Sequence, residues 1–412
     1  MNQATDLGML IMQRANALAR CTETPGMLTR TYLTSAHGDA AALLAQWMRE
    51  AGMNVRRDAV GNVIGRYDGI APDAPALLTG SHFDTVRNAG KFDGNLGILL
   101  PIACVAEWHR QDRRFPFAIE VIGFAEEEGV RFKATLLGSR ALAGTFDMSA
   151  LDRRDEQGLA MREAMTAAGL DAAALPQAAY RRDRALAYME VHIEQGPVLL
   201  DEDLAIGVVT AISGASRYLV TVTGLAGHAG TVPMGLRRDA AMAAAEIGLH
   251  IERRCSGSPG LVGTVGQLDV PNGAANVIPG KAIFTVDIRA ETDEVRLAAV
   301  HDVLEEMQRI AARRRVTLDV SKTHEVHSVP CAPWLQNQLE RAISGDGLPV
   351  RRLPSGAGHD AMAMAALTDV AMLFVRCGNG GISHHPDESM TADDARTAAR
   401  IFSRFVENFA KP

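Results

Sequence analysis

The stretch that decides the fold runs from residue 76 to residue 100 and reads ALLTGSHFDTVRNAGKFDGNLGILL. It opens with the short apolar run Ala76–Thr79, enters a loop rich in His and Asp after Gly80, and becomes apolar again from Gly94. The first run is typical of a strand, and the last, which continues to Arg110, is typical of a long apolar helix. A strand, a polar loop and a helix in this order predict one unit of an α/β sheet.

The same order of elements extends to both sides of this stretch. Upstream, Ala41–Ala51 has a helical pattern and Val55–Tyr67 resembles a hairpin; downstream, Phe117–Phe124 is a buried strand that leads into three glutamates. Strands that alternate with helices at this spacing predict a βαβ-type sheet with helices on both faces. Functional groups gather at the carboxyl ends of the strands in such sheets, and both polar loops lie there.

From about Ser213 the pattern changes to strands and helices in the order βαββαβ, which is typical of a ferredoxin-like unit. We expect these elements at 217–224, 239–253, 261–268, 281–289, 294–313 and 316–320. After about Pro330 the first pattern resumes, with helices at 334–343 and 359–367, a strand at 370–375 and a terminal helix at 392–409. We therefore predict a two-domain α/β protein, with a discontinuous catalytic domain at 1–212 and 330–412 and an inserted domain at 213–329.

Composition excludes several classes of protein. The 42 Lys and Arg residues against 49 Asp and Glu, without a long basic run, give no electrostatic footprint for nucleic acid. Apolar runs are shorter than the ~20 residues that a membrane span needs. Five scattered cysteines without a C-x-x-C pair argue against a disulfide framework. Because residues 7–12 read as the start of an amphipathic helix rather than a signal peptide, we expect a cytoplasmic protein.

Five short polar clusters carry the candidate chemistry: 81–85, 91–95, 126–129, 192–197 and 381–388. Singly, each has an ordinary structural explanation, because Asp93 could cap a helix, the glutamates could lie in a solvated loop, and the histidines could lie on the surface. Together they supply His, Asp and Glu ligands without a thiolate at predicted strand or loop ends. That ligand set suits Zn²⁺, Mn²⁺ or Co²⁺ in a hydrolytic site with two metal ions.

At this point the chain resembles the hydantoinase/carbamoylase group of dinuclear metal amidohydrolases, which is related to co-catalytic aminoacylases and carboxypeptidases. The resemblance rests on eight segments in the group's order: TGSHFDTV, GKFDGNLG, FAEEEGVRF, HIEQGPVL, GHAGTVPM, NVIPG, SGAGHDAM and GGISHHPDE. It implies a metallopeptidase-like αβα catalytic domain with an inserted ferredoxin-like lid and dimerisation domain. It also implies two divalent metal ions per subunit and a homodimer formed through the inserted domain.

The resemblance also implies roles for individual residues of the larger domain. The implied metal ligands are His82, Asp93, Glu128, His192 and His384, with Asp93 between the two ions. Glu127 would be the general base, Asp84 would hold His82, and Glu388 would support the site from behind the ligands. His384 rather than His385 is chosen because the ligand of the group directly follows Ser.

In the smaller domain, His228 is implied to reach the partner subunit's site and stabilise the oxyanion. Asn276 is implied to bind the substrate in the same way across the dimer, and Arg289 to hold its carboxylate with two hydrogen bonds. Three further residues are candidate substrate contacts: Gln195, Arg217 and His359.

The reaction implied is hydrolysis of a ureido group on an α-carboxylate compound. Segments 227–234, 361–364 and 372–377 resemble allantoate amidohydrolases, whereas Ala215 stands where those enzymes often carry Gln. We favour allantoate, with an N-carbamoyl-L-amino acid, ureidoglycolate or β-ureidopropionate as the alternatives. A peptidase or N-acylamino-acid deacylase would use the same metals. A non-enzymatic binding protein would be expected to lack some of the ligands or the base, all of which are present.

Overall fold

The computed structural model describes residues 6–411 and divides the chain into two compact units. Unit 1 comprises Met1–Thr210, Cys331–Leu353 and Gly358–Pro412, and unit 2 comprises Ala211–Pro330 and Pro354–Ala357. Residues 1–5 and 412, which our predicted domain limits include, lie outside the described residues. The short segment Pro354–Ala357 clusters with unit 2, although the sequence pattern placed it in the catalytic domain.

Unit 1 is built around one mixed sheet. The sheet consists of β1 (Asn54–Arg57), β2 (Val63–Tyr67), β3 (Ala76–His82), β4 (Ala118–Phe124), β5 (Ala185–Ile193), β6 (Ile206–Ile212), β14 (Val329–Pro330), β15 (Arg352–Ser355) and β16 (Val370–Val375). By the limits given above, β14 and the last two residues of both β6 and β15 are counted with unit 2. The strand order is β1-β2-β4-β3-β5-β16-β6-β14, and β15 pairs with β6. The central pairs β3–β4, β3–β5 and β5–β16 are parallel. Four parallel strands therefore end at one edge, as expected for an α/β fold, and the predicted hairpin is the antiparallel pair β1–β2.

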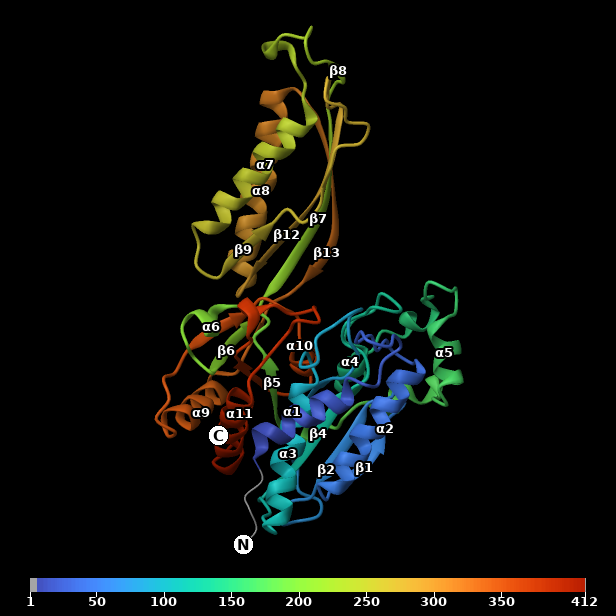
Figure 1. The fold of residues 1–412 in the computed structure, drawn as a ribbon, viewed down its shortest axis with the longest axis vertical. Coiled ribbons are helices and arrows are strands. Elements are labelled where there is room, and N and C mark those ends of the chain that lie inside the picture. Colours follow the sequence, from blue (N-terminus) through green and yellow to red (C-terminus); the bar gives the residue numbers. More distant parts are fainter. Residues whose placement is uncertain (1–5, 412) are drawn as a thin grey trace. The chain divides into compact units, whose positions relative to one another are not determined.

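The helices of unit 1 cover both faces of this sheet (Figure 1). They are α1 (Leu7–Leu18), α2 (Ser35–Glu50), α3 (Leu96–Arg110), α4 (Leu137–Ala143), α5 (Met161–Ala167), α6 (Val198–Asp201), α9 (Pro333–Ser344), α10 (Asp360–Met364) and α11 (Ala392–Glu407). The helices α1, α3 and α11 contact one another over the core face, which includes Met189 and Val191 of β5. Glu190 points to the opposite face, where the Ala361 amide at the start of α10 donates to its carboxylate.

Unit 2 contains a second, smaller sheet with two helices on one face, and a separate pair of short strands, β8 and β11. Its elements are β7 (Gly214–Thr223), β8 (Gly227–His228), α7 (Ala240–Ser256), β9 (Leu261–Thr264), β10 (Leu268–Asp269), β11 (Val277–Ile278), β12 (Lys281–Ala290), α8 (Asp293–Arg314) and β13 (Thr317–Val326). The strands β12 and β13 pair antiparallel with β7 on its two sides. In Figure 1, α7 and α8 lie side by side along this sheet. Alternate residues of β12 are buried beneath them, so Thr285, Asp287 and Arg289 lie on the other face.

Several element boundaries differ from the sequence prediction. The helix predicted over 41–51, for example, already begins at Ser35. The predicted strand 261–268 is interrupted after Thr264 and resumes at Leu268 as β10. Between the two parts, the Gln267 amide donates to the side-chain hydroxyl of Thr285 on the neighbouring strand. The predicted strand 316–320 continues to Val326. The sequence does not predict its polar second half, because that half lies on an exposed edge and has no apolar pattern. The predicted helix 359–367 is regular only over Asp360–Met364 and then tightens into turns.

Short 3₁₀ helices complete the described chain: η1 (Met148–Asp152), η2 (Ala172–Ala178), η3 (Arg182–Arg184), η4 (Met234–Leu236) and η5 (Asn379–Gly381). Among residues 6–411, no helix combines the length and apolar character that a membrane crossing requires. The five cysteines, all within this range, are free thiols.

Candidate metal centre

Three histidines surround the carboxylate of Asp93 in unit 1. The Nε2 atoms of His82 and His192 lie 3.7 and 3.4 Å from Asp93 Oδ1, and His384 Nε2 lies 3.2 Å from Oδ2. His82 ends β3, His192 lies near the end of β5, and Asp93 precedes α3. The parallel edge of the sheet thus brings together side chains from three distant parts of the chain, with histidines on both oxygens of one carboxylate.

Two glutamates from the loop after β4 join this cluster. Glu128 Oε1 lies 3.5 Å from His384 Nε2. Ligand-type atoms of His82, Glu127 and Glu128 lie within 4.8 Å of one another, and so do those of Asp93, Glu128 and His384. A third set of the same kind is His82, Asp93 and His192. Asp93 is therefore shared by two sets of three candidate ligands.

Asp84 contacts both His82 and the loop that carries the two glutamates. Its Oδ1 lies 3.4 Å from His82 Nδ1 and accepts the Glu127 amide at 3.0 Å, while Oδ2 accepts the Glu128 amide at 3.2 Å. The Asp84 side chain is almost fully buried, so these contacts are held in place. One carboxylate therefore orients the imidazole of His82 and the backbone from which both glutamates project.

A second set of contacts fixes Asp93 from the C-terminal part of the chain. Glu388 Oε1 accepts the backbone amides of Phe92 and Asp93 at 2.9 and 3.2 Å, and Oε2 accepts the Ser383 hydroxyl at 2.9 Å. The amide of Gln195 donates to Asp93 Oδ1 at 3.1 Å. Gln195 thus contacts a candidate ligand directly. Glu388 connects the two segments that carry Asp93 and His384.

The concentration of buried charge changes the proton affinity of these groups. Burial raises the pKa of Glu127 well above its usual range, and the carboxylates of Asp360, Asp84 and Asp93 add to this against the effect of His82. Burial lowers the pKa of His192 to about 4, although Asp93 opposes it. The hydrogen bond to Asp93 raises the pKa of the more exposed His384 to about 9. The buried carboxylates thus crowd negative charge into a small volume that a cation would balance.

The donor set fits divalent metal ions. Every group offers an imidazole nitrogen or a carboxylate oxygen, which are the ligands that Zn²⁺, Mn²⁺ and Co²⁺ accept. Apart from the half-exposed His384, the groups are buried or nearly so, and their backbone segments are fixed by Asp84 and Glu388. Two sets of three ligands that share Asp93 could hold two ions.

Comparison with known proteins identifies the family. Residues 78–408 match the family described as peptidase family M20/M25/M40. The chain belongs to this peptidase family. An N-carbamoyl-L-amino acid amidohydrolase from Geobacillus stearothermophilus is 41% identical over 98% of this chain and 99% of its own length. A probable allantoate deiminase from Oryza sativa subsp. japonica is also 41% identical, over 96% of this chain and 87% of its own.

Among solved structures, a hydantoinase/carbamoylase family amidase from Burkholderia multivorans aligns with a TM-score of 0.91 at 32% identity. The alignment covers 97% of both chains. The predicted resemblance and the mixed α/β fold of this M20 peptidase family are thereby confirmed. The chain is an amidohydrolase, an enzyme that hydrolyses C–N bonds.

Two candidate residues of unit 2 lie together in a small two-stranded sheet. His228 in β8 is paired with Val277 in β11, and the Ala229 amide donates to the carbonyl of Asn276 at 2.9 Å. The imidazole of His228 is exposed, and its Nδ1 accepts the Gly230 amide at 3.1 Å. The proton of the neutral ring is therefore on Nε2, which leaves Nε2 as a hydrogen-bond donor.

Two candidate arginines of unit 2 bind the same aspartate. Arg289 donates through Nε and Nη2 to the two oxygens of Asp287, and Arg217 Nε donates to Asp287 Oδ2 at 2.8 Å. Arg217 thus binds Asp287, the same aspartate that binds Arg289. The sequence did not indicate Asp287, because its pairing depends on the register between β7 and β12, in which residues 217 and 287 are opposite each other.

His359 lies under the metal centre and is almost fully buried. Its ring contacts that of His192 edge-on at a centroid distance of 4.4 Å and also packs near Phe374. Glu190, which the sequence analysis missed, is buried beside it and accepts the Ser81 hydroxyl at 2.7 Å. The alternation of Tyr188, Glu190 and His192 on one face of β5 is the signal that could have found it.

Arg30 is a second missed residue. It is fully buried, and its guanidinium donates to the carbonyls of Phe83 and Leu18 and to Asn95 Oδ1. Phe83 and Asn95 flank the segments that carry His82 and Asp93, so Arg30 joins the two loops from behind. Nothing in the local sequence around Arg30 indicates this, since all of these partners are distant in the chain.

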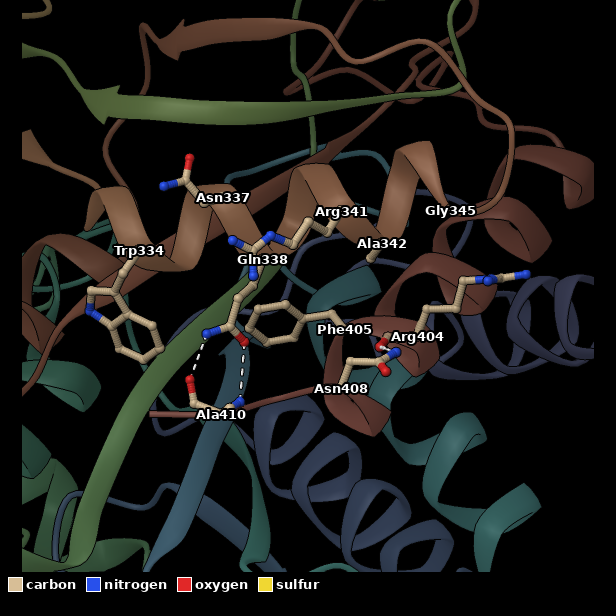
Figure 2. A pocket seen from close by; sticks show the side chains of 10 residues that line it. All are labelled: Trp334, Asn337, Gln338, Arg341, Ala342, Gly345, Arg404, Phe405, Asn408 and Ala410. Atoms are coloured by element: carbon tan, nitrogen blue, oxygen red, sulfur yellow. Dashed lines mark hydrogen bonds between the residues drawn. The ribbon is translucent and has the colours of Figure 1, made fainter. Parts of the chain in front are cut away.

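A cavity of about 620 Å³ in unit 1 lies elsewhere, between α9 and α11 (Figure 2). Its wall includes Trp334, Arg341 and Phe405, and Gln338 exchanges two hydrogen bonds with the backbone of Ala410. None of its lining residues has a carboxylate, imidazole or thiol group, so it offers no metal ligands. The cavity is therefore separate from the chemistry of the M20 centre.

Proposed function

We propose that this protein hydrolyses the ureido group of a compound that carries an α-carboxylate, with allantoate as its substrate. The observation that carries the proposal is the Asp93 carboxylate shared by two sets of candidate ligands beside Glu127. Relatives named N-carbamoyl-L-amino acid amidohydrolase and allantoate deiminase support the ureido chemistry equally.

His82 and His192 would hold one divalent ion with Asp93, and Glu128 and His384 would hold a second with the same aspartate. Such ions would supply Lewis acidity, which polarises a carbonyl and makes water a better nucleophile near neutral pH. Asp84 keeps the His82 ring and the Glu127–Glu128 backbone in position for this arrangement.

Glu127 would act as the general base and then as the general acid. It takes a proton from the attacking water as the new C–O bond forms, and it delivers that proton to the departing nitrogen as the C–N bond breaks. The carbamate that is released decays to carbon dioxide and ammonia. The burial of Glu127 among other carboxylates raises its pKa, and a raised pKa makes Glu127 a better proton acceptor, which suits this exchange.

Residues of unit 2 would bind the rest of the substrate. His228, whose Nε2 carries the proton, would donate to the oxyanion, and Asn276 would donate an amide hydrogen bond nearby. Arg289 would bind the α-carboxylate. In the larger unit, Gln195 contacts Asp93 and His359 contacts His192. These two residues would therefore support the candidate ligands and would not act on the substrate alone.

We further propose that unit 2 is a ferredoxin-like lid and dimerisation domain inserted into a catalytic domain. Its element order, β7-α7-β9-β12-α8-β13, supports this architecture. Large apolar side chains of unit 2 are exposed, and they support an interface: Leu225, Met234, Leu236, Met242 and Leu249. His228 and Asn276 would then act in the partner's site. The free thiols favour a reducing, cytoplasmic location.

The test is ammonia release by protein that has been stripped with a chelator and reloaded with Mn²⁺, Zn²⁺ or Co²⁺. Allantoate is compared with N-carbamoyl-L-methionine, N-carbamoyl-β-alanine and ureidoglycolate, and N-acetyl-L-methionine tests deacylation. We expect the highest kcat/KM with allantoate, and a fall in kcat of about 10²–10⁴-fold in Glu127→Gln. Preference for another ureido compound would correct the substrate. Cleavage of the acetyl compound alone would overturn the proposal.

A further inference from the structure

A guanidinium group in unit 2 is held along one edge and left available along another. Arg289 has five N–H bonds, of which Nε donates to Asp287 Oδ1 at 3.0 Å and Nη2 to Asp287 Oδ2 at 2.8 Å. Nη1 donates to the carbonyl of Gly356 at 2.7 Å. Three of the five donors are therefore engaged, and one N–H remains on each of the two terminal nitrogens.

The remaining pair of donors matches a carboxylate. Two N–H groups on the two terminal nitrogens of one guanidinium can bind both oxygens of a planar carboxylate with parallel hydrogen bonds. This requires a fixed guanidinium plane, since a free arginine side chain has several rotatable bonds and loses entropy on binding. Asp287 and the Gly356 carbonyl supply the restraint from two sides.

Asp287 is itself held in place. Its Oδ2 also accepts Arg217 Nε at 2.8 Å, so three N–H groups bind its two oxygens. Its pKa is lowered because the hydrogen bonds to Arg289 and Arg217 outweigh the effect of burial, so it stays ionised. Within this cluster of two arginines and one aspartate, one net positive charge remains, which matches a single carboxylate.

These side chains border a cavity. The space of about 530 Å³ on the face of the sheet opposite α7 and α8 is lined by Arg217, Thr264, Gln267, Thr285, Asp287 and Arg289, among others. A group held at this position would meet the arginine together with hydroxyl and amide side chains, a polar surrounding in which a carboxylate is readily accommodated.

We propose that Asp287 is the positioning residue of the substrate-carboxylate site, orienting Arg289 so that its two remaining N–H groups face a single carboxylate. The inference rests on the proposed ureido hydrolysis. Asp287 acts through Arg289 and does not touch the substrate, and Arg217 supports it by holding Asp287. The site accordingly favours monocarboxylates over substrates with a second negative charge near the first.

The test is a double-mutant cycle in steady-state kinetics on the best ureido substrate. Asp287→Asn keeps the shape of the side chain but removes its charge. Hydrogen bonds to charged groups typically change binding about 10- to 100-fold, so we expect KM to rise by that factor while kcat changes little. In an Arg289→Gln background, Asp287→Asn should add no further rise, because the residue through which it acts is gone.

Asp319→Asn is the matched control, since Asp319 is an exposed aspartate on β13 of the same unit. It should leave KM unchanged. Arg217→Gln is a second, milder variant and should raise KM less than Asp287→Asn does. The inference is overturned if Asp287→Asn lowers KM or leaves it within twofold, if its effect multiplies with that of Arg289→Gln, or if Asp319→Asn matches it. If the wild-type protein hydrolyses no ureido compound, the proposed function fails instead.

Discussion

Asp93 depends on neighbours that prevent it from moving. Its carboxylate meets three imidazoles, and its own backbone amide is bound by Glu388. His384 is the most exposed of those partners, with about half of its side chain accessible, and a second histidine follows it. The adjacent pair therefore allows a direct test of which imidazole belongs to the centre.

Replacement of His384 should weaken metal binding, whereas replacement of His385 should not. His384 Nε2 lies 3.2 Å from Asp93, while His385 Nδ1 accepts the amide of Asp387 at the surface. We expect His384→Asn to keep less than half of its bound metal after gel filtration, and His385→Asn to keep both metal ions. Inductively coupled plasma mass spectrometry measures the retained metal. Equal loss in both variants would show that the loop, and not one imidazole, holds the ion.

A second residue-scale prediction concerns His37, outside the metal centre. Its ring is fully buried against Phe83, Nε2 donates to the Ala125 carbonyl at 2.7 Å, and burial lowers its pKa to about 4. The unfolded chain binds this proton near pH 6.5, so stability is full above that pH and falls as the pH drops toward 4. At pH 5 the loss is about 2 kcal/mol in the free energy of unfolding.

Urea unfolding of chelator-stripped protein at pH 7.5 and pH 5 measures this loss. The variant His37→Gln cannot titrate, so it should be less stable at pH 7.5 but lose less stability on acidification than the wild type does. Parallel pH dependence in the two proteins would assign the acid sensitivity to other groups.

The residues that sequence alone could predict are those that follow strand ends. His82, Asp93 and the glutamates after β4 lie in short polar segments between apolar runs, and the parallel order of β3, β4 and β5 brings them together. Arg30 and Asp287 could not be predicted in this way. Their partners depend on strand register and loop packing, which single-sequence patterns do not contain.

At the scale of elements, the turn between β3 and α3 sets the position of the first ligand. Gly94 has a φ of +64°, and a Cβ built on it would lie 2.4 Å from the His82 carbonyl and 2.6 Å from its ring. The chain therefore needs glycine here both for the left-handed backbone and for the close approach of the imidazole. A side chain at this position must displace His82.

We expect Gly94→Ala to weaken metal binding by at least about tenfold and to lower kcat/KM correspondingly, because His82 loses its alignment with Asp93. Titration of the stripped protein with Zn²⁺ measures the affinity. The control is Gly169→Ala, which places alanine at a φ of +75° with no atom within 4 Å of its Cβ. It should show the strain in its melting temperature alone. Similar metal affinity in both variants would contradict the steric argument.

At the scale of the whole molecule, the proposed dimer makes a claim about which subunit completes each site. Unit 2 exposes Met234, Leu236 and Leu249, each with more than half of its surface accessible, on or beside the elements that follow His228. Burial of these side chains in a symmetric interface would let His228 serve the partner. Leu236→Glu with Leu249→Glu should therefore convert a particle of about twice 44.1 kDa into a monomer with little activity. Ile70→Glu, on an exposed apolar residue of unit 1, should change neither property.

Mixed dimers separate catalysis across the interface from catalysis within one subunit. Glu127→Gln and His228→Ala should each be inactive alone. If His228 acts in the partner's site, a dimer of one variant subunit with the other contains one site with both residues intact. Random reassortment makes half of the dimers mixed, so activity should recover to about a quarter of the wild-type value. If His228 acts within its own subunit, every site lacks one residue and mixing restores nothing. The recovered rate, measured after the subunits have been exchanged and reassembled, therefore decides between the two arrangements.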